Sequence, residues 1–195
     1  MIIGIEGFLG DGKTIYMVRC AKIDSENGRE IYSNFNLKGI KYKRLKIEDF
    51  LDITKAEKYK NASLFIDEIT LFMDCRRSSR KENIALSTLL RQSRKRDLDI
   101  YYTCQNLDET DLRLVRYTSI FVIAQRCYER IIEKGKEVLK EIPDFRQYVI
   151  VDTRMRQDNV TRLNINITEY YPYYNTDEIL QSIYEDKKYV LQKKK

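Results

Sequence analysis

Short apolar runs recur along the first two thirds of the chain, with polar and helix-compatible stretches or loops between them. Runs of this length that end at polar or turn-forming residues are typical of buried strands. The strands predicted in this way cover residues 2–6, 30–35, 63–67, 99–104 and 119–124. Strands that alternate with helices build a parallel sheet with helices on both faces, so we predict an α/β fold with a doubly wound sheet.

The pattern changes after residue 124. Gly135 interrupts a charged stretch that we interpret as helical, and residues 147–153 and 161–167 have the alternation of a two-stranded antiparallel hairpin that turns near residues 157–159. Nothing marks a second domain. We therefore predict a single domain over residues 1–195, with a core at 1–125 and a C-terminal extension of a helix and a hairpin at 126–195.

A glycine-rich motif of the form G-x-x-x-x-G-K-T directly follows the first predicted strand. In a phosphate-binding loop of this type, backbone N–H groups surround the phosphates, the lysine reaches the β- and γ-phosphates, and the last hydroxyl binds Mg²⁺. The start of the following helix adds its positive end. The alternative, an ordinary glycine turn, does not explain the strand, loop and helix in this order. The predicted nucleotide-binding residues are Gly7, Phe8, Leu9, Gly10, Asp11, Gly12, Lys13 and Thr14.

Two adjacent carboxylates, Asp67 and Glu68, end the strand predicted at 63–67. In a parallel sheet this position lies at the edge beside the loop, where Asp67 can hold Mg²⁺ together with Thr14 and Glu68 can act as the general base for water. The pair favours hydrolysis of ATP over transfer of phosphate, although a solvated acidic turn is the structural alternative. Gln105 ends the next strand, where a glutamine can contact the γ-phosphate or cap the following loop.

Composition restricts the other possibilities. The chain has 36 Lys and Arg against 30 Asp and Glu, a net charge of +6 that favours a polyanionic partner without establishing one. The chain has no histidine and no C-x-x-C pair, so a zinc site is not expected. The four cysteines are expected to be reduced thiols. No segment resembles a signal sequence or a membrane span, so we expect a cytoplasmic protein without membrane insertion.

Basic residues are concentrated after the acidic pair. Arginines there can contact DNA phosphates or project into the nucleotide site of a neighbouring subunit, and a solvated helix end is the alternative. Arg76, Arg77, Arg80 and Lys81 form one group, and the candidates for the arginine that acts in trans are Arg91, Arg94, Arg96, Arg113 and Arg116. The tyrosines at 170–174 can stack bases or pack over the hairpin.

The N-terminal phosphate loop, the acidic pair and the basic stretch that leads to Gln105 resemble the FtsK/HerA division of P-loop ATPases. Within it, residues 1–125 are most like the zonula occludens toxin-like and archaeal-virus genome-packaging ATPases. The resemblance implies a RecA-like (ASCE) fold in which the strand ending at Gln105 lies between the other two. It gives Lys13, Glu68 and Gln105 catalytic roles, with Gln105 as a γ-phosphate sensor.

The same resemblance implies ring-shaped homo-oligomers that move DNA, here most simply double-stranded DNA during viral packaging, with capsid or other virion proteins as partners in the host cytoplasm. The chain lacks the membrane span and the extra DNA-gripping domains found in many relatives, which disfavours extrusion through a membrane. Two other functions stay open: a small nucleotide or metabolite kinase, and an assembly protein that ATP switches between oligomeric states.

Overall fold

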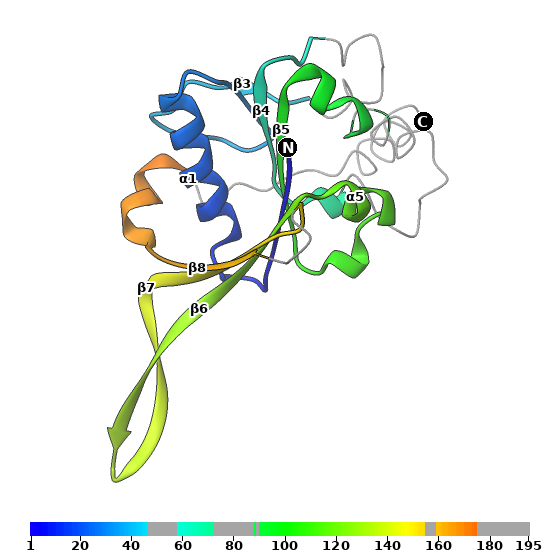
Figure 1. Cartoon of the computed structure of the whole chain (residues 1–195). Coiled ribbons are helices and arrows are strands. Elements are labelled where there is room, and N and C mark those ends of the chain that lie inside the picture. Colours follow the sequence, from blue (N-terminus) through cyan, green and yellow to red (C-terminus); the bar gives the residue numbers. More distant parts are fainter. Residues whose placement is uncertain (47–57, 72–87, 89, 155–158, 175–195) are drawn as a thin grey trace, which may run out of the picture.

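The structure is a computed structural model that describes residues 1–46, 58–71, 88, 90–154 and 159–174. Its centre is an eight-stranded sheet in the order β3-β2-β4-β5-β1-β6-β7-β8 (Figure 1). The first six of these strands in that order are parallel, whereas β7 and β8 are antiparallel additions to β6. The predicted doubly wound α/β fold is confirmed, and β5 lies between β1 and β4 as the family resemblance implied.

The strands and helices have the following bounds: β1 Ile2–Glu6, α1 Lys13–Glu26, β2 Glu30–Ser33, β3 Lys43–Arg44, β4 Ala62–Ile66, β5 Leu98–Cys104, α5 Leu112–Tyr117, β6 Ile120–Glu133, β7 Lys136–Asp152 and β8 Asn159–Asn166. Short 3-10 helices complete the described chain at η1 Ile69–Leu71, η3 Arg94–Arg96, η4 Leu107–Glu109 and η5 Ile167–Tyr173.

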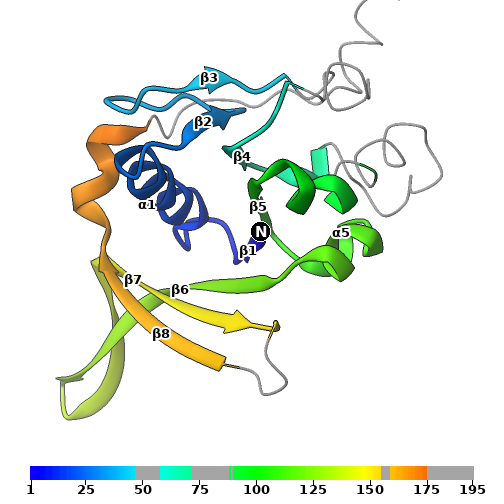
Figure 2. The ribbon, with the colours of Figure 1, turned by 45° about the horizontal axis from the view of Figure 1, so that its top comes forward.

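Alternate side chains of the central strands pack into two separate hydrophobic cores, one on each face of the sheet. Ile2, Leu64 and Ile100 point to the face covered by α5, whereas Ile3 and Phe65 point to the face covered by α1. Figure 2 shows α1 and η5 on one side of the sheet and α5 on the other. Because both faces are covered, the central strands read as continuous apolar runs, which explains why the sequence revealed them.

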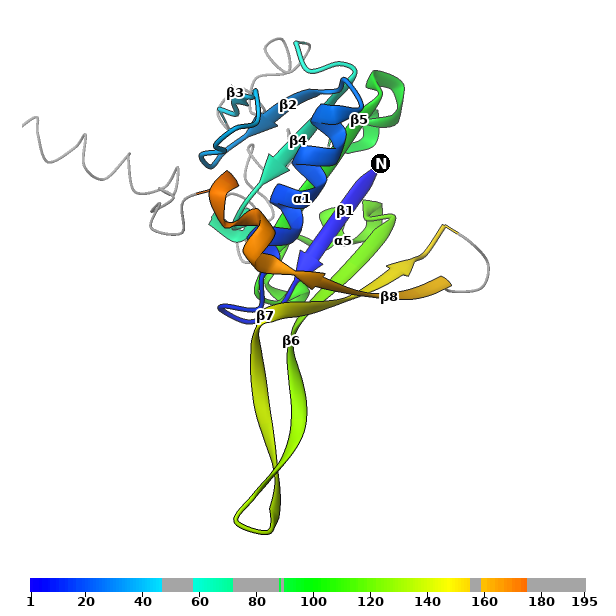
Figure 3. The same cartoon turned by 90° about the vertical axis from the view of Figure 1, so that its left-hand side faces the viewer.

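The prediction of a helix in the charged stretch around Gly135 is wrong. Residues 120–152 instead form a long antiparallel ribbon of β6 and β7 that projects from the body of the molecule (Figure 3). Lys134 and Gly135 both have positive φ, 50° and 74°, as the two central residues of a type I′ hairpin turn require. Opposite charges also face each other across the strands, Glu129 opposite Lys140 and Glu133 opposite Lys136, which stabilises the pairing.

The second predicted hairpin is present as β7 and β8, which pair from Phe145 opposite Asn166 to Asp152 opposite Asn159. Its expected turn falls largely on residues 155–158, outside the described residues. The tyrosines at 170–174 belong largely to η5, which contacts α1 and β7, so the packing interpretation of this cluster holds for Tyr170, Tyr173 and Tyr174. The cysteines Cys20, Cys104 and Cys127 are free thiols, and Cys75 lies outside the described residues.

Candidate nucleotide-binding site

The phosphate loop lies where the sequence placed it, between β1 and α1 at the carboxyl edge of the sheet. Gly10 and Gly12 have φ values of 82° and 89°, a region that other residues enter only with strain. A Cβ atom on Gly12 would lie 2.8 Å from the Tyr148 hydroxyl, so space as well as conformation requires glycine there. Gly12 is the N-cap of α1 and no side chain caps this end of the helix, so the N–H groups of the first turn are suited to bind an anion.

Lys13 is buried at the start of α1. Its Nζ donates hydrogen bonds to the carbonyl oxygens of Gly7 and Phe8, at 2.9 and 3.1 Å. These bonds fold the side chain back over the loop, so the ammonium group lies against the loop backbone. A cation held by neutral carbonyl groups can exchange their oxygens for phosphate oxygens.

Asp67 follows β4 and meets the loop through Thr14, whose Oγ1 donates to Asp67 Oδ2 at 3.1 Å. Burial raises the pKa of the Asp67 carboxyl, while hydrogen bonds from Thr103 and Thr14 oppose this shift. A hydroxyl and a carboxylate oxygen side by side form the hard oxygen donor set that Mg²⁺ prefers, and Mg²⁺ usually completes its shell with waters and phosphate oxygens. The residues present therefore fit a magnesium ion.

Glu68, the next residue, lines the same cleft as Lys13 and Thr14. Its φ of 53° is left-handed, a conformation that costs energy for a residue other than glycine and that clusters at functional sites. Burial, and then the charge of neighbouring Asp67, raise the pKa of the Glu68 carboxyl. A carboxylate with a raised pKa beside a phosphate site is suited to accept a proton from water.

Two residues that the sequence did not single out hold this acidic pair. Thr103, on β5, donates from Oγ1 to Asp67 Oδ1 at 2.5 Å and accepts the Glu68 backbone N–H at 2.8 Å. Asn34, after β2, pairs with the Asp67 backbone through both amide atoms, at 2.7 and 2.9 Å. The polar Thr103 within a buried strand was a usable signal, since the β4 and β5 register that pairs Ile66 with Tyr102 places it beside Asp67.

Loop and acidic pair border one open cleft of about 680 Å³. Beyond its polar end, the cleft has an apolar and aromatic wall that suits a purine base and its sugar. The lining residues are Leu9, Gly10, Gly12, Lys13, Thr14, Ile15, Phe35, Asp67, Glu68, Arg146, Ile167, Tyr171 and Tyr174.

Gln105 directly follows β5, whose last residue Cys104 lies opposite Glu6, the residue before the phosphate loop. The sheet edge predicted for Gln105 is therefore the one observed. Its side chain is exposed and does not border the cleft described above, so the sensor role stays a prediction.

None of the arginines predicted to act in trans borders this cleft. Arg91 donates to the Tyr117 hydroxyl at 2.7 Å, and Arg96 donates to the Gln92 side chain. Arg113 is held by two bonds of 2.9 Å to the buried Asp111 carboxylate, whereas Arg94 and Arg116 border separate clefts. Their roles stay predictions, and Arg76, Arg77, Arg80 and Lys81 lie outside the described residues.

The strand order β4-β5-β1, the phosphate loop after β1 and the carboxylates after β4 define a RecA-like P-loop NTPase fold. Solved structures share it. The N-terminal domain of zonular occludens toxin from Neisseria meningitidis superposes with a TM-score of 0.59 at 18% identity, over 89% of this chain and 98% of that one.

The genome-packaging NTPase B204 of Sulfolobus turreted icosahedral virus 2, in complex with ATP-gammaS, gives a TM-score of 0.54 at 14% identity, over 82% of this chain and 95% of that one. B204, the DNA-packaging ATPase from Sulfolobus turreted icosahedral virus, gives the same values, a TM-score of 0.54 at 14% identity over 82% and 95%. At these identities the likeness establishes the fold, and at that level it confirms the resemblance seen in the sequence.

No protein-family model matches the chain, and no curated protein matches its sequence. Within the described ranges, no helix has the length and apolar character needed to cross a membrane.

Proposed function

We propose that the protein is a Mg²⁺-dependent ATPase. The observation that carries the proposal is the hydrogen bond between Thr14 of the phosphate loop and Asp67, with Glu68 bordering the same cleft. This arrangement supplies an anion site, an oxygen pair for a metal and a base, the three groups that hydrolysis of a nucleoside triphosphate needs. Support for nucleotide binding also comes from B204, which shares the fold and was solved with ATP-gammaS.

Each residue has a role in this reaction. Lys13 leaves the Gly7 and Phe8 carbonyls and binds the β- and γ-phosphates, while Glu68 orients a water and takes its proton. Thr14 and Asp67 hold Mg²⁺, which neutralises phosphate charge when bound. The aromatic residues Tyr171 and Tyr174 pack against the base.

We further propose that hydrolysis drives translocation of double-stranded DNA, as in packaging of a viral genome, by a ring of identical subunits. The net charge of +6 and the exposed arginines favour a polyanionic partner, and one structural neighbour is a genome-packaging NTPase. Arginines that do not border the nucleotide cleft of their own chain are suited to reach a neighbour's site or the DNA. In this role capsid or other virion proteins recruit the motor in the host cytoplasm.

Steady-state ATP hydrolysis tests both proposals. We expect turnover by the native chain to require Mg²⁺, and Glu68→Gln to lower kcat by about 10²–10³-fold while ATP binding is kept, because only the base is lost. Double-stranded DNA should stimulate turnover, and the stimulation should decrease with salt because phosphate contacts release counterions.

The outcomes separate the alternatives. If turnover depends on Glu68 but does not change when DNA is added at low or moderate salt, this result would contradict translocation and still support the ATPase. Phosphate transfer to an added nucleoside or metabolite, without hydrolysis in its absence, would identify a kinase and overturn the ATPase. ATP-dependent assembly with turnover too slow to measure would identify the assembly switch.

A further inference from the structure

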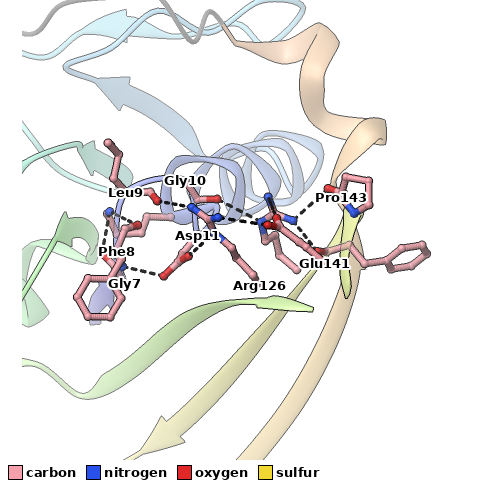
Figure 4. A network of polar contacts seen from close by, with 11 residues as sticks. Gly7, Phe8, Leu9, Gly10, Asp11, Arg126, Glu141 and Pro143 are labelled. Carbon is pink, nitrogen blue, oxygen red and sulfur yellow. Dashed lines mark hydrogen bonds and ion pairs between the residues drawn. The ribbon is translucent and has the colours of Figure 1, made fainter. Parts of the chain in front are cut away.

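The base of the β6–β7 ribbon, where Arg126 lies opposite Arg146, is hydrogen-bonded to the phosphate loop. On β6, Arg126 donates from Nη2 to the Leu9 carbonyl at 3.0 Å and from Nε to the Asp11 carboxylate at 3.2 Å. Asp11 in turn accepts the Phe8 backbone N–H at 2.8 Å, so the contact reaches the start of the loop (Figure 4).

The second strand of the ribbon contributes Arg146. Its Nε donates to the Gly10 carbonyl at 3.2 Å, and its Nη1 donates to the carbonyls of Pro143 and Phe145 at 3.0 and 2.8 Å. Arg146 is almost fully buried and borders the nucleotide cleft. Arg126 and Arg146 thus donate hydrogen bonds to two consecutive carbonyl groups of the loop, those of Leu9 and Gly10.

One carboxylate, Glu141 on β7, joins the two arginines. Its Oε2 lies 3.2 Å from Arg126 Nη1, and its Oε1 lies 3.3 Å from Arg146 Nη2. Without this carboxylate, two guanidinium groups would lie close together beside the loop and repel each other. Glu141 therefore holds both arginines against the loop while it does not itself contact the loop.

The carbonyl contacts fix the orientation of two peptide groups in the phosphate loop. A trans peptide directs its C=O and N–H in opposite directions, so an arginine on the Leu9 carbonyl also sets the direction of the Gly10 N–H. The next peptide, with its carbonyl on Arg146, sends the Asp11 N–H to the Phe8 carbonyl at 3.2 Å and closes the loop. Preorganised N–H groups bind an anion without a cost for ordering.

We propose that Glu141 is a positioning residue for the nucleotide site, acting through Arg126 and Arg146 on the phosphate loop. The proposal rests on the proposed ATP-binding function and extends the site to the projecting ribbon. Displacement of the base of the ribbon would change the loop, because Arg126 and Arg146 connect the two.

The test is the affinity for ATP, measured by titration calorimetry, of the native chain and of Glu141→Gln. Glutamine keeps the shape but removes the charge that both arginines require, so we expect the Kd for ATP to rise about tenfold, the loss of one charge-assisted hydrogen bond. We expect kcat at saturating ATP to change by less than about twofold, because Asp67 and Glu68 are not part of the network.

Glu137→Gln is the matched control. Glu137 lies on the same strand and the same face of the ribbon, nearer its tip, and forms no ion pair with any described residue. It should bind ATP like the native chain, and thermal unfolding of each variant checks that the fold is kept.

A double-mutant cycle tests the route. If Glu141 acts through the two arginines, then Glu141→Gln should have little further effect in a background that carries both Arg126→Gln and Arg146→Gln, whereas independent effects would add. Native-like ATP affinity of Glu141→Gln, or additive losses in the cycle, would overturn the proposal while the native chain still binds ATP. If the native chain itself fails to bind ATP, the proposed function fails first.

Discussion

The hydroxyl group of Thr103 provides the sharpest test of how the acidic pair is held. Thr103→Val keeps the volume of this fully buried side chain but removes the donor to Asp67 and the acceptor for the Glu68 N–H. Loss of the hydrogen bond to a carboxylate costs about 1.5–3 kcal/mol, and a buried N–H left unpaired costs about 1–3 kcal/mol. Together these give an expected decrease of about 2.5–6 kcal/mol in the free energy of unfolding.

Thr103→Ser is the converse change, since it keeps the hydroxyl and removes one methyl group, at a cost of about 1 kcal/mol. Urea unfolding without nucleotide measures both variants, and ATP hydrolysis shows whether the acidic pair still works. We expect Thr103→Val to lose most of the ATPase activity and Thr103→Ser to retain it. If Thr103→Ser is destabilised as much as Thr103→Val, the packing of Thr103 and not its hydroxyl holds Asp67 and Glu68 in place, and the reasoning is refuted.

Three further predictions concern the loop, the metal and the thiols. Gly12→Ala should raise the Kd for ATP at least tenfold, because the left-handed backbone and the side chains packed against it leave no room for a methyl group; native-like ATP affinity in calorimetry would contradict this. Excess EDTA should abolish hydrolysis, and Thr14→Ala should raise the Mg²⁺ concentration needed for half-maximal rate, so an unchanged requirement would remove Thr14 from the metal site. Burial raises the pKa of the Cys20 and Cys104 thiols to about 12, so few of these thiols are thiolates at pH 8. Iodoacetamide should therefore label the half-buried Cys127 before either of them, as measured by mass spectrometry of digested peptides. Equal labelling of all three cysteines would contradict the buried positions of Cys20 and Cys104.

The phosphate loop and the acidic pair were readable from sequence because their chemistry is local. Gly10, Gly12, Lys13 and Thr14 lie within one turn of chain, and their spacing alone fixes which atoms can surround a phosphate. The apolar runs also revealed the parallel strands, since strands covered on both faces have no polar side to confuse the pattern.

The ribbon was misread because its sequence satisfies two local patterns. Charged residues interspersed with Ile131, Ile132 and Leu139 suit an exposed helix as well as a two-stranded ribbon. The left-handed turn at Lys134 and Gly135 and the cross-strand pairing decide between them, and both depend on a partner strand.

The loop, the carboxylates and the strands that carry them could therefore be predicted, because residues adjacent in the chain set these features. What holds them in place depends on contacts between distant parts of the fold. Arg126 meets Asp11 across 115 residues, and Arg146 meets Gly10 across 136. Such contacts depend on which strands become neighbours in the sheet and in what register, and no local periodicity along the chain encodes that choice.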